Sequence, residues 1–181
     1  RVFHASNGIL IVLALELLSL DRIFVLTILA GLLLLLLAMD AVRLARPGLN
    51  RLFFQVFSSL ASPREAKKIA SSTWYLCGAV LTLLLFPISV AVPGILVLAL
   101  ADPAAGFVGR KWGTLRLGAG TVRGSATFLA VTFMVLLPYV PWWAALAASL
   151  ATTLVEAIPW PLDDNLTIPL TSAGVLLLLT S

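Results

Sequence analysis

Three consecutive polar residues, Asp163, Asp164 and Asn165, stand directly before an apolar stretch that begins at Leu166. Adjacent carboxylates with an amide beside them suit a hard, oxygen-liganded cation such as Mg²⁺. Alternatively, one carboxylate can cap a helix by accepting hydrogen bonds from the free N–H groups of its first turn. Because a cap needs one such residue and not three, we favour a cation site and keep the cap as the alternative.

A second segment, Asp102–Gly113, combines an acid, small residues and the basic pair Arg110-Lys111. We expect Asp102 to end one apolar helix, after which Gly106 and Gly109 would let the backbone approach a ligand closely. An aspartate can hold a metal, and an Arg beside a Lys offers a forked cation and a point cation for phosphate. The alternative is that the glycines pack helices together while the basic pair reaches the membrane surface.

A third segment, Thr121-Val-Arg-Gly-Ser125, precedes another apolar stretch. The free N–H groups of a helix start, a hydroxyl of Thr121 or Ser125 and the cation of Arg123 together make an anion site. Taken alone, the segment is better interpreted as an ordinary hydroxyl cap beside an arginine. Taken with carboxylates on the same face, it favours phosphate as the ligand.

The composition places these residues in a membrane protein. Of 181 residues, 61% are hydrophobic and 11% are charged, and the mean hydropathy is +1.09. So few charged side chains cannot cover the surface of a soluble domain of this size. A soluble enzyme, a disordered tail and a nucleic-acid-binding module are therefore excluded. The single cysteine, Cys77, permits no internal disulfide and is expected to pack among apolar residues.

The apolar stretches predict an all-α integral membrane protein with about seven transmembrane helices. Unbroken runs rich in Leu and Ala argue against a barrel, whose strands alternate apolar and polar residues. We treat residues 1–181 as a single transmembrane domain. The expected spans are Ala5–Leu20, Ile23–Met39, Ser71–Phe86, Ile88–Ala101, Ala126–Tyr139, Trp142–Ile158 and Leu166–Thr180.

Threading these spans puts every Lys and Arg except Arg22 on one face, together with six of the eight acids. The positive-inside rule makes that face cytoplasmic, so the N-terminus is inside, the C-terminus outside and the active site cytoplasmic. Two further predictions concern acids. Asp40 and Arg43, three residues apart, form a local ion pair. Glu16, deep in the first span, faces the bundle interior as a functional candidate or as a protonated, packed side chain.

The three segments together resemble the polyprenol kinase family of CTP-dependent lipid kinases, which includes dolichol kinase, phytol kinase and the CTP-type diacylglycerol kinase, and is related to the phosphatidate cytidylyltransferases. The block Asp163–Pro169 is the most specific part of the resemblance. Asp40–Arg43 with Pro47–Asn50, and Arg64-Glu65 before Tyr75–Gly78, are similar to upstream blocks of the family.

The resemblance implies that the terminal phosphoryl group of CTP passes to the hydroxyl of a membrane lipid alcohol: diacylglycerol, a polyprenol such as dolichol, phytol or farnesol. Mg²⁺ or another divalent cation would be held by Asp102, Asp163 and Asp164, and Glu156 or one of the aspartates would be the catalytic base. The nucleotide would be bound by Arg64, Gly106, Gly109, Arg110, Lys111, Thr121, Arg123, Gly124, Ser125 and Asn165.

Two rival functions remain at this stage. In a cytidylyltransferase a lipid phosphate attacks the α-phosphorus of CTP and diphosphate leaves. A small membrane transporter is the non-enzyme alternative, but transporters place polar groups at the midplane and on both faces. Here the polar residues gather on one face, which favours the enzyme. The residues do not fix the oligomeric state.

Overall fold

The computed structural model describes the backbone of residues 2–57, 63–159 and 161–180, and the side chains in these ranges except those of residues 2–4, 63 and 64. The described part of the chain is almost wholly helical. Its α-helices are α1 Val2–Val12, α2 Arg22–Ala45, α3 Pro47–Val56, α4 Ser71–Leu85, α5 Ile88–Trp112, α6 Val122–Leu136, α7 Trp142–Ala157 and α8 Asp164–Thr180; a π-helical turn, Leu13–Leu17, extends α1, and a 3-10 turn spans Pro63–Lys67.

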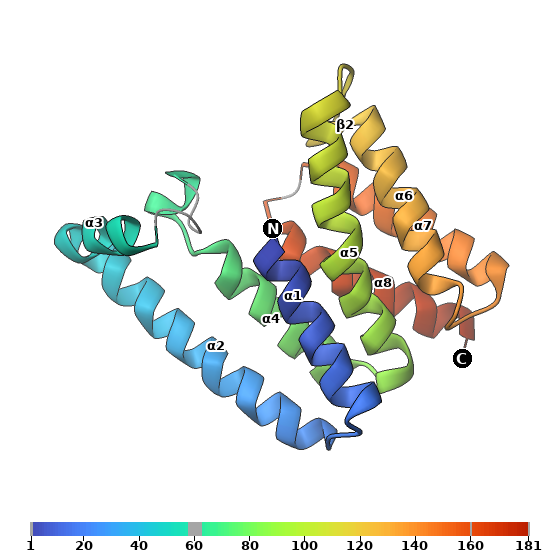
Figure 1. Cartoon of the computed structure of the whole chain (residues 1–181), viewed down its shortest axis with the longest axis horizontal. Coiled ribbons are helices and arrows are strands. Elements are labelled where there is room, and N and C mark those ends of the chain that lie inside the picture. Colours follow the sequence, from blue (N-terminus) through green and yellow to red (C-terminus); the bar gives the residue numbers. More distant parts are fainter. Residues whose placement is uncertain (1, 58–62, 160, 181) are drawn as a thin grey trace.

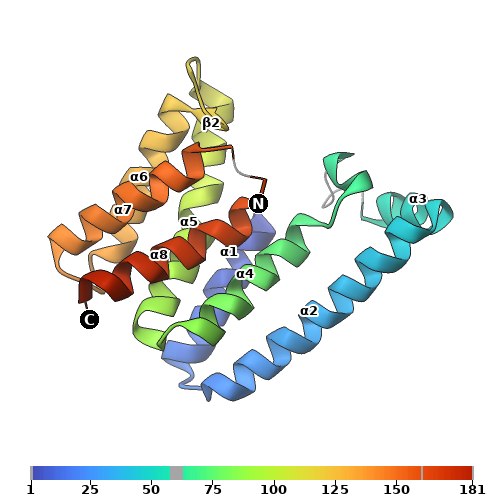
Figure 2. The same cartoon turned by 180° about the vertical axis from the view of Figure 1, so that it is seen from behind.

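Helix α5 is the centre of the bundle and packs against α1, α6 and α8, while α7 and α4 pack on α8 (Figure 1; Figure 2). The core consists of apolar side chains from these helices, among them the fully buried Leu98, Phe128 and Ile168. Small residues bring the helices close: beside Gly94 of α5 a Cβ atom would lie 2.9 Å from the carbonyl oxygen of Pro169 on α8. Burial of these apolar faces is the main force that holds the bundle together.

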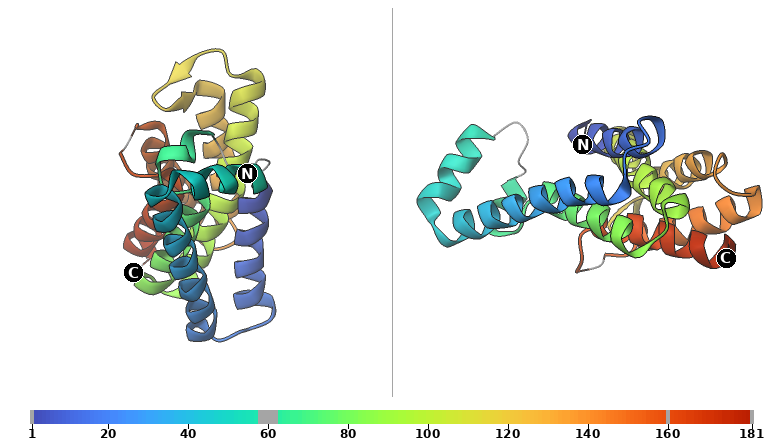
Figure 3. Two further views of the ribbon diagram at one scale, coloured as in Figure 1. Left: turned by 90° about the vertical axis from the view of Figure 1, so that its left-hand side faces the viewer. Right: turned by 90° about the horizontal axis from the view of Figure 1, so that it is seen from below.

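Helix α2 leaves this bundle. It runs antiparallel to α4 and contacts it at both ends, but it diverges from α1 and carries α3 away from the other helices (Figure 3). It is 24 residues long. Its most apolar stretch of 18 residues has a mean hydropathy of 2.6, yet only 17% of that stretch is buried. Among the described residues, two helices, α2 and α5, are long and apolar enough to cross a membrane, and shorter apolar helices accompany them.

The connections lie at two ends of the molecule. We call the end with residues 46–57, 63–70, 113–121, 158–159 and 161–163 the upper end, and the end with residues 18–21, 86–87 and 137–141 the lower end (Figure 1). The predicted short connections at the lower end are confirmed. Asp21 begins α2 there by accepting hydrogen bonds from the backbone of Ile23 and Phe24, and proline precedes α5 and α7.

The one cation predicted for the opposite face lies at this lower end. The guanidinium of Arg22 donates hydrogen bonds to the carbonyl oxygens of Leu83 and Leu84 in the last turn of α4. These carbonyls have no partner within their own helix, and they carry the negative end of its dipole. The hydrogen bonds to the end of α4 therefore explain why an arginine lies at the lower end.

Two predictions are wrong, one about the end of a helix and one about the exposure of an acidic side chain. Asp102 does not end its helix: α5 continues past Pro103 to Trp112, because a proline removes only one backbone hydrogen bond while packing on α1, α6 and α8 holds the helix. Glu16 does not face the bundle interior: it is exposed at the lower end, where the hydroxyl of Tyr139 donates to it at 3.2 Å. Burial and the nearby Glu16 raise the pKa of Tyr139 to about 12.

Candidate functional site

Asp102 lies half-buried inside α5. It is close enough to the hydroxyl of Tyr75, on α4, for the two groups to interact electrostatically. Tyr75 is 2% exposed, and its hydroxyl occupies the place that a side chain at Gly8 on α1 would need. Helices α1, α4 and α5 therefore meet around the hydroxyl of Tyr75.

Glu156 and Ser125 form the contact between α7 and α6 at the upper end. The hydroxyl of Ser125 donates a hydrogen bond of 3.1 Å to a carboxylate oxygen of Glu156. Ser125 is buried and Glu156 half-buried, so the carboxylate is held at the last turn of α7 instead of extending into solvent. The predicted base and a predicted phosphate ligand are thus direct neighbours.

A short hairpin covers this pair. Strands β1 (Arg116–Leu117) and β2 (Gly120–Thr121) are antiparallel, and Gly118 takes a positive φ of 50° in the turn between them. Such a turn favours glycine. The hairpin is fixed to α7 because the N–H of Ala119 donates to the carbonyl of Ala157 at 3.0 Å. A Cβ on Gly120 would lie 3.6 Å from the carboxylate of Glu156.

The glycines of the second and third segments meet where α5 and α6 cross. A Cβ on Gly124 would lie 3.5 Å from the Cα of Gly109 and 3.0 Å from the hydroxyl oxygen of Thr121. That hydroxyl accepts a hydrogen bond from the N–H of Gly124 and caps α6. These contacts match the alternative reading, in which glycines pack helices and a hydroxyl caps one. Gly106 lies half-buried one turn after Asp102.

The three basic residues of these segments lie on the outside of the upper end. Arg110 is exposed. The ammonium of Lys111 lies over the rings of Phe107 and Trp112, 5.6 and 4.7 Å from their centroids. Arg123 donates a hydrogen bond of 2.7 Å to the carbonyl of Trp112, the last residue of α5. Arg123 thereby ties the start of α6 to the end of α5.

The polar residues Asp163, Asp164 and Asn165 lie at the start of α8. A carboxylate oxygen of Asp163 accepts hydrogen bonds from the backbone N–H and the side-chain amide of Asn165, at 3.0 and 2.6 Å. Asp163 is thus the helix cap that the alternative reading foresaw, and Asp164 is the first residue of α8. The backbone of Asn165 lies against Gly78 of α4, where any side chain would collide with it. Gly78 is one turn below Tyr75, so α4 connects the start of α8 to the surroundings of Asp102.

The described residues contain no group of three or more His, Cys, Asp or Glu side chains that could hold a metal ion between them. Asp102, Asp163 and Asp164 therefore do not form the single three-carboxylate cage that we expected. Mg²⁺ that accompanies a nucleotide needs only one or two carboxylates besides the phosphates, so this donor set still fits such an ion. Arg64 was expected to bind the nucleotide, but its side chain lies outside the described residues.

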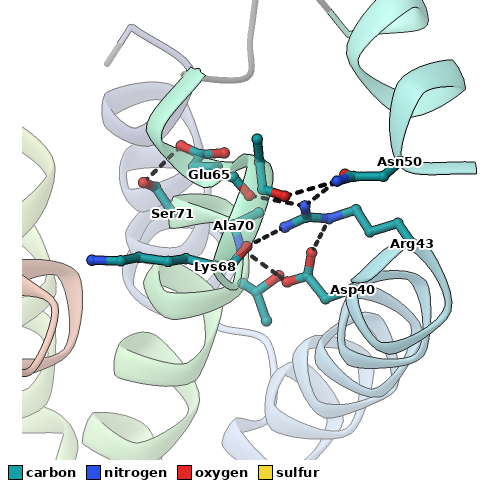
Figure 4. Close-up of polar contacts among 9 residues, drawn as sticks. Asp40, Arg43, Asn50, Glu65, Lys68, Ala70 and Ser71 are labelled. Carbon is teal, nitrogen blue, oxygen red and sulfur yellow. Dashed lines mark hydrogen bonds and ion pairs between the residues drawn. The ribbon is translucent and has the colours of Figure 1, made fainter. Parts of the chain in front are cut away.

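The upstream blocks converge in one buried cluster, shown in Figure 4. The predicted ion pair is confirmed: Nε of Arg43 is 2.6 Å from Asp40, and both side chains are buried. The guanidinium also donates to the side-chain oxygen of Asn50 and to the backbone carbonyls of Glu65 and Lys68. The cluster thus joins α2, α3 and the segment that leads into α4.

Tyr75 and Gly78 belong to the upstream block Tyr75–Gly78, for which the sequence alone predicts no role. A hydroxyl and a glycine three residues apart on an apolar helix give one face a polar group and a point of close approach. That spacing was the available signal. The partners, Asp102 and Asn165, are contributed by helices much later in the chain.

Comparison with known proteins identifies the family. A CTP-dependent diacylglycerol kinase 1 of Schizosaccharomyces pombe is 30% identical over 165 residues, which cover 77% of this chain and 74% of the relative. The protein of the same name from Eremothecium gossypii is 34% identical over 116 residues, 64% of this chain and 36% of the relative. No protein-family model and no solved structure matches the chain. Because both relatives are kinases by name, a cytidylyltransferase is not favoured. The chain belongs to the family of CTP-dependent lipid kinases that contains these diacylglycerol kinases.

Proposed function

We propose that this lipid kinase is a multi-pass membrane enzyme that transfers the terminal phosphoryl group of CTP to the hydroxyl of diacylglycerol. The observation that carries the proposal is the identity to two proteins named for this reaction, one of them aligned over most of both chains. The gathering of the predicted site segments at one end of a helical bundle supports it. We treat residues 1–181 as one domain.

The membrane arrangement that we propose has seven crossing segments: α1 with its π-helical extension, α2, α4, α5, α6, α7 and α8. Large apolar side chains are exposed on their outer faces, among them Leu34 at 68% and Leu178 at 79%. A protein in water rarely exposes so many leucines, whereas lipid tails accept them. In the described part of the chain every Lys and Arg except Arg22 lies at the upper end. By the positive-inside rule this end faces the cytoplasm, where CTP is available.

In this proposal the nucleotide lies over the upper end. The first turns of α6 and α8 direct free N–H groups and the positive ends of their dipoles toward it, and both suit phosphate. Thr121, Ser125 and Asn165 supply polar groups beside those turns. The cations that bind the phosphates would be Arg110, Lys111, Arg123 and Arg64. The backbone could approach the phosphates closely at Gly106, Gly109 and Gly124.

Asp102, Asp163 and Asp164 would hold Mg²⁺, one or two carboxylates to an ion, with the phosphates as further ligands. The ion would neutralise the charge on the phosphates during transfer. Asp163 can take part while it caps α8, because both hydrogen bonds from Asn165 go to the same carboxylate oxygen, Oδ1.

Glu156 is the proposed base that accepts the proton of the lipid hydroxyl. A general base must be oriented and within hydrogen-bond reach of the group that it deprotonates. The hydroxyl of Ser125 donates to one oxygen, Oε2, and holds the carboxylate beneath the hairpin. The other oxygen, Oε1, is directed toward Gly120, where the absence of a side chain leaves space.

The test is an assay of purified protein with CTP labelled in the terminal phosphate. Diacylglycerol, a polyprenol, phytol, farnesol and phosphatidate would be offered separately. We expect CDP and labelled phosphatidate from diacylglycerol, with lower turnover of the isoprenoid alcohols. Release of diphosphate with phosphatidate as the only accepted lipid would overturn the kinase assignment, and preference for an isoprenoid alcohol would overturn the choice of acceptor.

A further inference from the structure

A cleft of about 340 Å³ lies between α1, α2 and α4. It exists because α2 contacts α4 and diverges from α1, so that α1 and α2 form opposite walls with α4 between them (Figure 1). Its volume falls in the range of small-molecule sites. The site described above does not include it.

The lining of the cleft changes in character along its length. Asn7, Ser72 and Tyr75 contribute polar groups from the upper parts of α1 and α4. The other lining residues are apolar. On α1 and α4 they follow the polar residues toward the lower end, as Leu10, Ile11 and Leu76, and the wall formed by α2 consists of Leu29, Leu32, Leu35 and Leu36. A cleft that is polar at one end and apolar along the rest matches an amphiphile, with its polar group at the upper end.

The polar end of the cleft adjoins the candidate site. Tyr75 belongs to the cleft lining and also interacts electrostatically with Asp102 across the α4–α5 interface. A hydroxyl held beside Tyr75 would therefore lie next to one of the carboxylates assigned to catalysis. This continuity distinguishes the cleft from other apolar surfaces of the molecule.

The lining of the cleft does not suit a nucleotide. Among the described residues that line it there is no Lys, Arg, Asp or Glu, and burying phosphates without cations is unfavourable. Its rim is open to the surroundings of α2, since Leu32 is 47% and Leu35 56% exposed. In a membrane this rim faces lipid, so a hydrocarbon chain can enter sideways without passing through water.

We infer that this cleft binds one hydrocarbon chain of the acceptor lipid and directs the polar end of the lipid, past Asn7, Ser72 and Tyr75, toward Asp102 and the upper end of the bundle. The inference rests on the proposed function and adds the place and direction from which the acceptor arrives. Tyr75, Ser72 and Asn7 are positioning residues in this assignment.

The first test narrows the cleft. Leu32→Trp places a large ring in it, and Leu34→Trp, on the same helix but outside the lining, is the matched control. Leu32→Trp should lower kcat/KM for dioleoylglycerol at least about tenfold, as loss of fit in an apolar pocket does, while dibutyrylglycerol is phosphorylated at the wild-type rate. The control should leave both acceptors unchanged. An equal loss for both acceptors with Leu32→Trp, or no loss for dioleoylglycerol, would overturn the inference.

The second test uses the wild-type protein and needs no turnover. A diacylglycerol with a photoactivatable diazirine near the end of one chain is irradiated in vesicles that contain the enzyme, and labelled peptides are identified by mass spectrometry. Peptides with Leu10, Leu32 and Leu76 should be labelled, and unlabelled diacylglycerol should compete. Labelling that is not competed would show ordinary membrane lipid and overturn the inference. Wild-type protein that phosphorylates no lipid alcohol refutes the proposed function, whereas labelling elsewhere in an active enzyme refutes only the cleft.

Discussion

The carboxylate of Asp40, on α2, accepts a hydrogen bond of 2.8 Å from the hydroxyl of Thr73, on α4. The same oxygen accepts a bond of 3.0 Å from the N–H of Ala70, the residue directly before α4. A residue of α2 thus anchors the start of α4. Since α4 carries Tyr75 and Gly78 to the candidate site, Asp40 fixes where both of them lie.

Removal of this carboxylate should destabilise the fold. In Asp40→Ala the buried guanidinium of Arg43 loses its counter-ion and the start of α4 loses two hydrogen bonds. Breaking a buried pair in this way costs about 3–5 kcal/mol. Thermal unfolding in detergent should show a clear fall in Tm for Asp40→Ala. In the control, Arg51→Ala, an exposed residue is changed, so the free energy of unfolding should stay within about 0.5 kcal/mol of wild type and Tm should change little. Equal Tm values for both variants would contradict the structural role of Asp40.

Gly78→Ala should separate α4 from α8. The added methyl group would collide with the backbone of Asn165, which cannot move without shifting the start of α8. We expect a loss of stability of about 1–3 kcal/mol from this overpacking and a loss of activity. The matched control is Gly31→Ala on α2, where nothing lies within 4 Å of the new Cβ. That variant should be slightly more stable than wild type, because alanine is the better helix former. A tolerated Gly78→Ala would mean that the two helices are farther apart.

Asp102→Asn and Asp164→Asn should each lower turnover by at least about a hundredfold, since a carboxylate that holds a cation in the transition state is lost. EDTA should abolish activity of the wild-type enzyme, and added Mg²⁺ should restore it. Asp21→Asn is the matched control at the lower end, because asparagine also caps a helix and α2 keeps its start. Near-normal turnover in the Asp102→Asn, Asp164→Asn double variant would refute the metal assignment.

Glu156→Gln should bind CTP with nearly normal affinity and turn over at least about a hundredfold more slowly, as expected for loss of a general base. The amide can still accept the hydrogen bond from Ser125, so the packing of α6 on α7 is kept. Calorimetry would measure CTP binding, and release of CDP would measure turnover. Glu16→Gln at the lower end is the control and should be as active as wild type. Weak CTP binding by Glu156→Gln would assign Glu156 to the nucleotide instead.

The proposed orientation can be tested with single cysteines in a Cys77→Ala background. Leu115→Cys, at a position 69% exposed, and Gly48→Cys lie at the upper end, and Leu18→Cys lies at the lower end. In sealed right-side-out vesicles a membrane-impermeant maleimide should label only Leu18→Cys. In inverted vesicles it should label only the other two. Labelling of Leu115→Cys and Leu18→Cys from the same side would refute the arrangement with seven crossings.

Much of the fold follows from local patterns in the sequence. The apolar runs predict the helices, Asp21 and the prolines at 87 and 141 mark the turns, and Thr121 caps α6 as hydroxyl residues do. The i, i+3 spacing predicts the Asp40–Arg43 pair. The blocks around Asp102, Thr121 and Asp163 indicate the family. These signals are readable because capping, turns and helical spacing depend on residues within about one helical turn of each other.

Only the tertiary structure decided the rest. The continuation of α5 past Pro103 depends on its packing against three other helices, which outweighs a local helix breaker. The contact of Ser125 with Glu156, and those of Tyr75 with Gly8 and Asp102, join residues from helices far apart in the chain. The cleft beside α2 exists because that helix diverges from α1. Helix crossing angles depend on how whole faces of side chains interdigitate, and no spacing along one helix determines them.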